Sequence, residues 1–351
     1  MTRVVGIVGA GRMGTGIAQV VVEAGDRVRI HDASPAAVDA ALERVRDGLA
    51  RRADGRHPTT GPDWIAERMD RIATAATPAA LAREADLVIE AVVEDLDVKR
   101  ELFHALDAAA APDAILATNT SALRVHDIAA ATASPERVIG LHWFNPPTRM
   151  ALVEVIAAER TSAEVVGRAI AAVTAWGRTP VRSADTPGFI VNRVNRPFTI
   201  EALRLLEARI ADVPTIDAAL RGAGFPMGPF ELMDLTGIDI SLAAARGVWE
   251  GLGRPEHLRP SPIQEGLVAA GRLGRSTGEG FYRYVEGRRG EPAEGFAFTL
   301  PTVPDPASIA ACIVGAIDAE AARAAAAGVA SRDDIELALR LGAGHPVRST
   351  P

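Results

Sequence analysis

A histidine and a glutamate near the middle of the chain are spaced for acid–base chemistry. His142 follows the apolar segment 138–141, and Glu154 lies inside a second apolar segment, 152–156. Each segment predicts a buried strand, and a carboxylate inside such a strand is costly unless it is paired. Because the Asn-Pro-Pro sequence at 145–147 turns the chain between the two strands, Glu154 can reach the imidazole. A glutamate that orients an imidazole is typical of a general base, and a structural ion pair is the alternative.

A glycine-rich turn near the N-terminus is typical of a dinucleotide site. Gly9-Ala-Gly11-Arg-Met-Gly14 follows the apolar segment 4–8 and opens a helix-compatible stretch. Gly9 allows a tight turn, Gly11 lets the backbone approach a pyrophosphate, and Gly14 permits close packing of helix and strand. Asp32 can accept hydrogen bonds from ribose hydroxyls and would repel a 2′-phosphate, which favours NAD over NADP. A glycine turn without a ligand and a Rossmann unit for another nucleotide are the alternatives.

The elements that must position these groups alternate between strands and helices. The glycine turn after the first strand, with helical periodicity between the strands, predicts an α/β domain with a Rossmann-type doubly wound sheet over 1–183. A helical arm is expected over about 35–72. Ligands of such sheets bind at the carboxyl ends of the strands, so His142 and the glycine turn share one edge. Apolar or alternating segments predict strands over 4–8, 26–30, 86–93, 114–118, 138–141, 152–156 and 179–182.

The strand signal fades in the second half of the chain. Helical segments predict an all-α domain over 184–284, and residues 285–306, rich in glycine, proline and charge, predict a linker. The segment 307–351 carries a faint repeat, because Glu320-Ala-Ala-Arg323 matches Glu201-Ala-Leu-Arg204 at an offset of 119 that a second stretch shares. We therefore expect a partial second copy of the helical domain, with chance similarity between alanine-rich helices as the alternative.

Composition and charge exclude several classes of protein. The 351 residues are 48% hydrophobic and 24% charged, as in soluble globular proteins, and the net charge of −7 gives no sign of nucleic-acid binding. The lone cysteine, Cys312, cannot form an intrachain disulfide, so a reducing compartment fits and we expect a cytoplasmic location. Without a long apolar run or a leader-like N-terminus, we expect neither membrane insertion nor secretion. We also expect no metal ion.

Several further motifs of the sequence occur together with the glycine turn. They are Gly140-Leu-His-Trp-Phe-Asn-Pro146, Leu152-Val-Glu-Val-Ile156, Asn119-Thr-Ser121, Thr186-Pro-Gly-Phe-Ile-Val-Asn-Arg193, Glu90-Ala-Val-Val-Glu94, Gly228-Pro-Phe-Glu231 and Thr277-Gly-Glu-Gly-Phe-Tyr282. Together these motifs resemble the L-3-hydroxyacyl-CoA dehydrogenase family, of the 3-hydroxybutyryl-CoA dehydrogenase type. The resemblance implies that His142 and Glu154 form the catalytic pair, and that Ser121 and Asn192 hold the substrate oxygen. Taken alone, Ser121 is as well explained as a helix cap and Asn192 as a solvent-facing helix residue.

The same resemblance implies further cofactor contacts. It places Glu94 and Lys99 at the cofactor and active site, and Lys99 is the only lysine in the chain. A compact ammonium that reaches a ribose or carboxamide cannot be replaced freely by a planar guanidinium. A solvated charge at a helix start is the alternative for Lys99, and a simple turn residue is the alternative for Asn145. Met13, Asn119 and Asn145 complete the expected cofactor set.

The resemblance also implies that the helical arm meets the coenzyme A portion of the substrate. The arm carries several arginines, of which Arg52 and Arg56 are assigned to substrate binding because a guanidinium suits phosphate. An arginine-rich solvated helix face is the alternative. The chain departs from the family at Ala122, where a second serine is usual, and Ser121 alone is expected to make the substrate contact.

These observations predict an NAD-dependent enzyme of fatty-acid β-oxidation that reversibly oxidises L-3-hydroxyacyl-CoA to 3-ketoacyl-CoA. His142 would be the general base and Glu154 its orienting partner. The expected partners are an acyl-CoA thioester and a second copy in a homodimer through the helical domain, with no nucleic acid and no membrane. A dehydrogenase of a free hydroxy acid or sugar acid, and a catalytically inactive NAD-binding structural protein, are the alternatives. The acyl chain length, and whether the acyl group is dicarboxylic, stay open.

Overall fold

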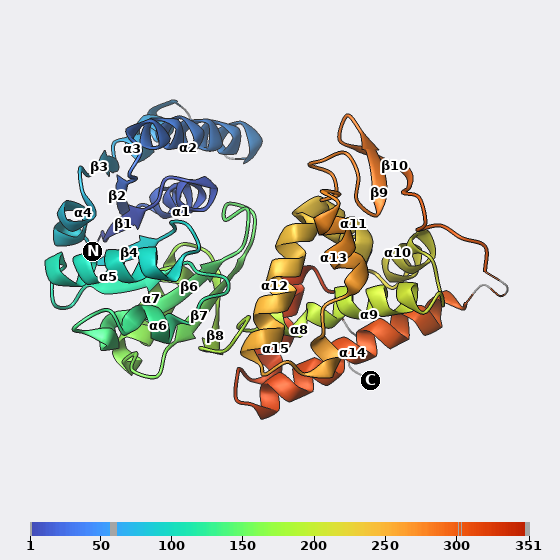
Figure 1. Ribbon diagram of the computed structural model, residues 1–351. Coiled ribbons are helices and arrows are strands. Elements are labelled where there is room, and N and C mark those ends of the chain that lie inside the picture. The colour runs from blue at the N-terminus through green and yellow to red at the C-terminus, as the bar shows by residue number, and fades with distance from the viewer. Residues whose placement is uncertain (1, 57–61, 301, 303, 348–351) are drawn as a thin grey trace. The chain divides into compact units, whose positions relative to one another are not determined.

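In the computed structural model, residues 2–56, 62–300, 302 and 304–347 are described, with the backbone alone at 54–56 and 62. The chain forms two compact units, Met1–Thr186 and Pro187–Pro351 (Figure 1). None of the helices within these described ranges is long and apolar enough to cross a membrane.

The first unit is a doubly wound sheet with helices on both faces, as predicted. Its strands lie in the order β3-β2-β1-β4-β5-β6-β7-β8, which begins like the Rossmann order 3-2-1-4-5-6. Neighbouring strands are parallel except β6 and β7, which run antiparallel. The strands are β1 (Val4–Val8), β2 (Arg27–His31), β3 (Ile72–Thr74), β4 (Leu87–Glu90), β5 (Ile115–Thr118), β6 (Val138–Trp143), β7 (Leu152–Ala157) and β8 (Thr179–Ala184).

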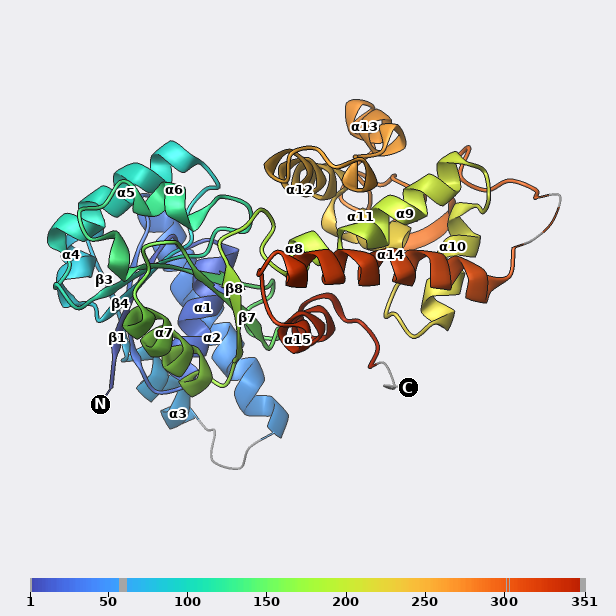
Figure 2. The same ribbon diagram turned by 90° about the horizontal axis from the view of Figure 1, so that it is seen from below.

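The two layers of helices account for the apolar sequence of the strands. Parallel strands covered on both faces are buried throughout, and β4, β5 and β6 contain only buried residues. Helices α1 and α7 cover one face, and α4, α5 and α6 cover the other (Figure 2). The helices of this unit are α1 (Arg12–Glu23), α2 (Pro35–Arg56), α3 (Pro62–Met69), α4 (Pro78–Glu84), α5 (Leu96–Ala109), α6 (Val125–Ala129), the short η1 (Pro135–Arg137) and α7 (Ala163–Ala175).

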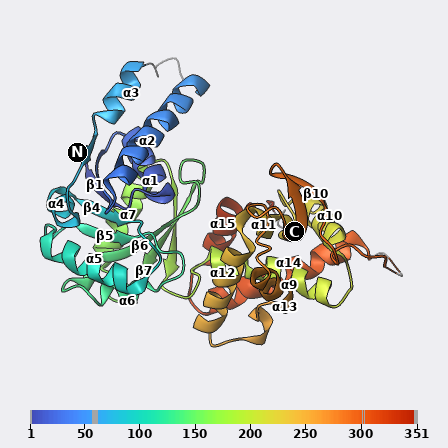
Figure 3. The same ribbon diagram turned by 45° about the horizontal axis from the view of Figure 1, so that its top comes forward.

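The expected helical arm is the pair α2 and α3, which lie side by side (Figure 3). The buried side of α2 joins the main core through Val38, Val45 and Leu49, which recur at helical spacing. Arg44 of α2 donates a hydrogen bond to the carbonyl oxygen of Ala10 at 3.0 Å. The arm is therefore anchored to the glycine turn itself.

The second unit is mostly helical. Its helices are α8 (Val191–Val194), α9 (Arg196–Glu207), α10 (Val213–Gly222), α11 (Pro229–Thr236), α12 (Ile238–Gly251), the short η2 (Glu256–Leu258), α13 (Pro262–Ala269), α14 (Pro306–Ala326) and α15 (Arg332–Ala343). It also contains a hairpin of β9 (Tyr282–Val285) and β10 (Arg288–Pro292).

This hairpin corrects the first part of the predicted linker over 285–306, because residues 285–292 belong to it. Glu286 and Gly287 between the strands both have positive φ, as a two-residue hairpin turn requires. The carboxylate of Asp234 accepts hydrogen bonds from the backbone N–H groups of Phe281 and Tyr282, which fixes the start of the hairpin. An exposed hairpin is as rich in glycine and charge as a linker, so composition did not distinguish the two.

Helices α14 and α15 pack against helices of their own unit. Helix α14 contacts α9 and α10, and α15 contacts α8 (Figure 2). Glu201 pairs with Arg204 as Glu320 pairs with Arg323, each three residues apart. The second copy of the helical domain stays a prediction, and these matched ion pairs support it.

Candidate active site

The strand pair β6 and β7 brings His142 and Glu154 together. The two residues lie directly opposite each other in the antiparallel register. The Nδ1 atom of His142 is 2.6 Å from the Oε2 atom of Glu154, whose side chain is 0% exposed. The predicted pairing is therefore present, and the turn between the two strands is what creates it.

This geometry gives the histidine a defined orientation. The carboxylate of Glu154 accepts a hydrogen bond from Nδ1 of His142, so the imidazole carries its proton on that nitrogen. The other nitrogen, Nε2, is then the one that can exchange a proton. The ring of Phe144 packs against the imidazole with centroids 4.6 Å apart. His142 lies at the carboxyl end of β6, the edge where ligands of open α/β sheets bind.

The glycine turn has the shape that a pyrophosphate requires. Gly9 has a φ of 106°, and a Cβ there would lie 2.4 Å from the carbonyl oxygen of Ala91. A Cβ on Gly14 would lie 1.8 Å from the carbonyl oxygen of Gly9. A Cβ on Gly11 would meet nothing within 4 Å, so open space faces this residue at the start of α1. The space beside a helix N-terminus is where an anionic pyrophosphate fits.

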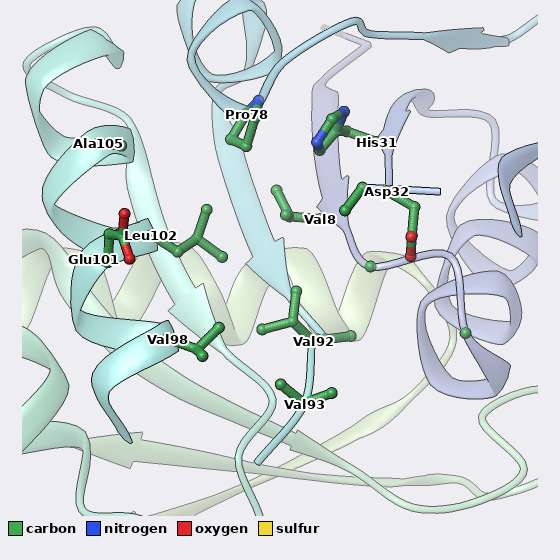
Figure 4. A pocket seen from close by; sticks show the side chains of 14 residues that line it. Val8, His31, Asp32, Pro78, Val92, Val93, Val98, Glu101, Leu102 and Ala105 are labelled. Carbon is green, nitrogen blue, oxygen red and sulfur yellow. The ribbon is translucent and has the colours of Figure 1, made fainter. Parts of the chain in front are cut away.

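A pocket of about 730 Å³ continues from this turn along the carboxyl ends of β1, β2 and β4 (Figure 4). Asp32 lies in its wall, where its carboxylate accepts hydrogen bonds from the backbone N–H groups of Ala10 and Ser34. These bonds hold the carboxylate beside the glycine turn, as a ribose partner requires. Val92 and Val98 give the pocket an apolar side that suits an adenine ring (Figure 4).

Lys99 lies in a buried network rather than on the surface of this pocket. Its side chain is 1% exposed, and its Nζ atom is 2.6 Å from Glu90 and 3.2 Å from Glu94. Glu90 also accepts a hydrogen bond from Thr118 at 2.7 Å. The structure thus gives Lys99 two carboxylate partners of its own chain, whereas we expected it to reach a ribose or carboxamide.

Glu94 holds the loop that carries Ser121. Its carboxylate accepts hydrogen bonds from the hydroxyl of Thr120 and from the backbone N–H groups of Ser121 and Ala122. Partial burial opposes ionisation of Glu94, but the charge of Lys99 and these hydrogen bonds keep its pKa below the ordinary value. Glu94 is therefore an anion that fixes the loop, and Lys99 is its ion-pair partner.

The amide of Asn119 connects this loop to β6. Its Oδ1 atom accepts a hydrogen bond from the backbone N–H of Trp143 at 2.9 Å. Trp143 is the residue after His142, so the loop after β5 and the end of β6 are held together. The expected cofactor residue Asn119 thus contacts the residue next to His142.

Four of the other predicted residues belong to the first unit, and one belongs to the helical unit. Met13 packs against the main core beside the glycine turn, and Asn145 is exposed in the loop after β6. Arg52 is 68% exposed on α2, with Glu23 at 3.8 Å. Arg56 ends α2, and its side chain lies outside the described part of the chain. Asn192 belongs to the helical unit, where it lies on α8.

Sequence reasoning assigned no role to two carboxylates that support the site. Glu90 is one, and the signal was available, because an acid ends the apolar segment Leu87–Glu90 just as Glu154 interrupts its own strand. Asp185 is the other, and it accepts hydrogen bonds from the backbone N–H groups of Val125 and His126 at the start of α6. No local pattern pointed to that pairing.

The fold and the site together define a dinucleotide-dependent dehydrogenase with a histidine–glutamate pair. Residues 4–186 match the 3-hydroxyacyl-CoA dehydrogenase NAD binding domain, and residues 188–284 match the 3-hydroxyacyl-CoA dehydrogenase C-terminal domain. The chain therefore belongs to the 3-hydroxyacyl-CoA dehydrogenase family, and NAD is its cofactor.

Named relatives agree with this assignment. A 3-hydroxyadipyl-CoA dehydrogenase from Escherichia coli (strain K12) is 45% identical over 283 residues, which are 79% of this chain and 58% of that protein. This chain thus spans less than two thirds of that relative. The mitochondrial hydroxyacyl-coenzyme A dehydrogenase of Mus musculus is 41% identical over 79% of this chain and 90% of its own length.

A solved structure extends the likeness over nearly the whole chain. The crystal structure of 3-hydroxybutyryl-CoA dehydrogenase from Escherichia coli K12 has a TM-score of 0.87 and 33% sequence identity. The matched region covers 97% of this chain and 89% of that chain. The similarity therefore includes α14 and α15, which lie beyond the residues matched by the two family domains.

Proposed function

We propose that this protein oxidises an L-3-hydroxyacyl-CoA to the 3-ketoacyl-CoA with NAD, in a reversible reaction that uses His142 as the general base. The observation that supports this most directly is the 2.6 Å contact of His142 with the buried Glu154 at the carboxyl edge of the sheet. A secondary alcohol can lose a hydride only as its hydroxyl proton is removed, and this pair can remove it.

The two ring nitrogen atoms of His142 have different roles in this reaction. Nε2 of His142 takes the hydroxyl proton, while Nδ1 keeps its hydrogen bond to Glu154. The carboxylate then stabilises the imidazolium that forms. When bound, NAD supplies the acceptor for the hydride that leaves C3. In the reverse direction the same nitrogen of His142 returns the proton to the ketone oxygen.

Ser121 and Asn192 hold the substrate oxygen in this proposal. The loop of Ser121 is fixed by Glu94, so its hydroxyl belongs to a rigid part of the site. Orientation of C3 by such contacts is a large part of the reduction of the barrier. The arginines of the arm, Arg52 and Arg56 among them, would meet the phosphates of coenzyme A.

One assay separates this function from its alternatives. The purified chain should consume NADH, followed by absorbance, when acetoacetyl-CoA is added. It should neither consume NADH with free acetoacetate nor reduce NAD with free hydroxy acids or sugar acids. Activity with the free acids alone would indicate the hydroxy-acid dehydrogenase. If NADH binds but none of these substrates is turned over, the protein is a structural NAD-binding protein.

The proposal extends to assembly and location. We propose a homodimer through the helical unit, in a cytoplasmic protein. Helices α14 and α15 already cover parts of α8, α9 and α10 in their own chain, so a dimer would have to use the remaining helix faces. Light scattering should give twice the 36.8 kDa of one chain, and a mass of one chain would contradict the dimer.

A further inference from the structure

A second carboxylate lines the cofactor pocket, on the side opposite Asp32 (Figure 4). Helix α5 contributes four residues to the wall of the pocket, which are Val98, Glu101, Leu102 and Ala105. They recur at intervals of three or four residues or fewer, so they share one face of the helix. Three of them are apolar, as the wall of a pocket for an aromatic base requires, and Glu101 is the exception.

The carboxylate of Glu101 is available to a ligand. Its side chain is exposed, and within the described part of the chain it forms no hydrogen bond or ion pair. The carboxylates nearer to β4 are different, because Glu90 and Glu94 both pair with Lys99. Glu101 therefore keeps its full capacity to accept hydrogen bonds.

The two acidic residues of the pocket face different parts of a dinucleotide. Asp32 is held beside the glycine turn through the backbone of Ala10, where a ribose belongs. Val92 and Val98 lie between Asp32 and Glu101 (Figure 4). A base that is joined to a ribose at Asp32 and packs on these valines extends toward α5. Glu101 is then placed for the edge of the base that lies farthest from the ribose.

The other polar side chain of the pocket wall lies on the ribose side. His31 directly precedes Asp32 at the end of β2, away from α5 (Figure 4). Its Nδ1 atom is 3.0 Å from the carbonyl oxygen of Ala75, which holds the ring in place. Among the described residues that line the pocket, Glu101 is thus the polar side chain on the side of α5.

The chemistry of a carboxylate determines which base it favours. The edge of adenine that lies farthest from the ribose carries a 6-amino group, which donates hydrogen bonds. An ionised carboxylate only accepts hydrogen bonds, so the two groups are complementary. A purine with a 6-oxo group has an acceptor in the same place, and two acceptors repel each other. Such a mismatch leaves both groups without a partner, which costs affinity.

We propose that Glu101 selects the base of the dinucleotide by accepting a hydrogen bond from the 6-amino group of adenine. The family assignment gives NAD as the cofactor, and Glu101 adds the group that distinguishes its adenine from a 6-oxo purine. The residues that carry this inference all belong to the first unit. It concerns cofactor binding alone, so it does not depend on the proposed acyl-CoA reaction.

The test compares NADH with reduced nicotinamide hypoxanthine dinucleotide, in which a 6-oxo purine replaces adenine. The fluorescence of the reduced nicotinamide gives both Kd values without any acyl-CoA. The wild-type protein should bind NADH about 5- to 20-fold more tightly, the range for one hydrogen bond that solvent partly reaches. Glu101→Gln should bring the ratio of the two Kd values close to 1, because an amide accepts from an amino group and donates to an oxo group.

A matched control is available on the same helix. Asp97→Asn makes the same change from acid to amide at a side chain that is 96% exposed and does not line the pocket. This variant should keep the wild-type ratio of the two Kd values. Glu101→Ala removes the acceptor without adding a donor, and it should also bring the ratio close to 1.

Several results would overturn the role of Glu101. One is a wild-type ratio close to 1, and another is a wild-type ratio that persists in Glu101→Gln or Glu101→Ala. Equal weakening of both dinucleotides in these variants is a third, since the carboxylate would then act on a part that the two ligands share. If Glu101→Gln does not fold, the wild-type ratio and Glu101→Ala still decide the question. Failure to oxidise a 3-hydroxyacyl-CoA would contradict the proposed function and leave these Kd values unchanged.

Discussion

Replacing Glu154 by glutamine leaves His142 with a neutral partner of nearly the same shape. The side chain of Glu154 is fully buried and lies 2.6 Å from the imidazole, so water cannot substitute for the lost charge. The ground state keeps a hydrogen-bond acceptor, whereas the imidazolium that forms during proton transfer loses its counter-charge. The substitution should therefore slow the chemical step far more than it weakens binding.

The size of the effect follows from this single contact. A hydrogen bond to a charged group contributes about 1.5–3 kcal/mol. Each 1.4 kcal/mol changes a rate by about tenfold. We therefore expect Glu154→Gln to lower kcat by about 10- to 150-fold, with NADH affinity retained. His142→Gln removes the base itself and should cost about 10²- to 10⁴-fold.

The assay is NADH absorbance with acetoacetyl-CoA, with NADH binding measured separately by fluorescence. Glu159→Gln, at an exposed carboxylate just after β7, and His104→Gln, at an exposed histidine on α5, are the matched controls. Since Glu154 acts through His142, the double variant should be no slower than His142→Gln alone. Thermal melts of each variant show whether the fold is intact.

Two results would refute this reasoning. A folded Glu154→Gln variant whose kcat stays within about twofold of the wild type would show that the carboxylate does not stabilise a transition-state charge. If the fold-decrease in kcat of the double variant equals the product of the two single decreases, the two residues act independently. Glu154 would then not be the orienting partner of His142.

Further predictions concern the cofactor, the buried ion pair and pH. Asp32→Ala should weaken NAD binding and relax discrimination against NADP, and an unchanged preference in a titration would remove Asp32 from the site. Glu320→Ala should lower the free energy of unfolding by about 3–5 kcal/mol, because it leaves Arg193 buried without its counter-charge. Denaturant unfolding measures this free energy, and an unchanged value would contradict a stabilising role for the buried pair. Burial raises the pKa of Asp217 from 3.8 to about 7, so its folded state holds a proton more tightly. The free energy of unfolding should therefore fall as pH rises from 3.8 to about 7, and a pH series with Asp217→Asn should show a weaker slope.

Much of the fold was predictable because its signals are local. Seven of the eight strands of the main sheet were expected from apolar or alternating segments, and each lies within or close to its predicted range. The missed strand, β3, has three residues at the sheet edge with none buried, so it carries no apolar signal. The hairpin of β9 and β10 was missed for a related reason, since its exposed strands have the composition of a loop.

The candidate site divides in the same way. The glycine turn and the pairing of His142 with Glu154 depend on segments twelve residues apart or fewer, so spacing and strand pattern predicted them. The network of Lys99 was not predictable in detail. Whether a lone lysine meets a ligand or Glu90 depends on the packing of α5 against the sheet.

The sequence by itself determined the Rossmann architecture, the dinucleotide turn and the acid–base pair, because backbone conformation and strand burial follow from neighbouring residues. Tertiary structure alone decided which charges meet. Arg193 and Glu320 are separated by 127 residues, and the packing of the helices brings them to 2.8 Å. A sequence of many arginines and many carboxylates permits numerous pairings, and only packing in three dimensions selects among them.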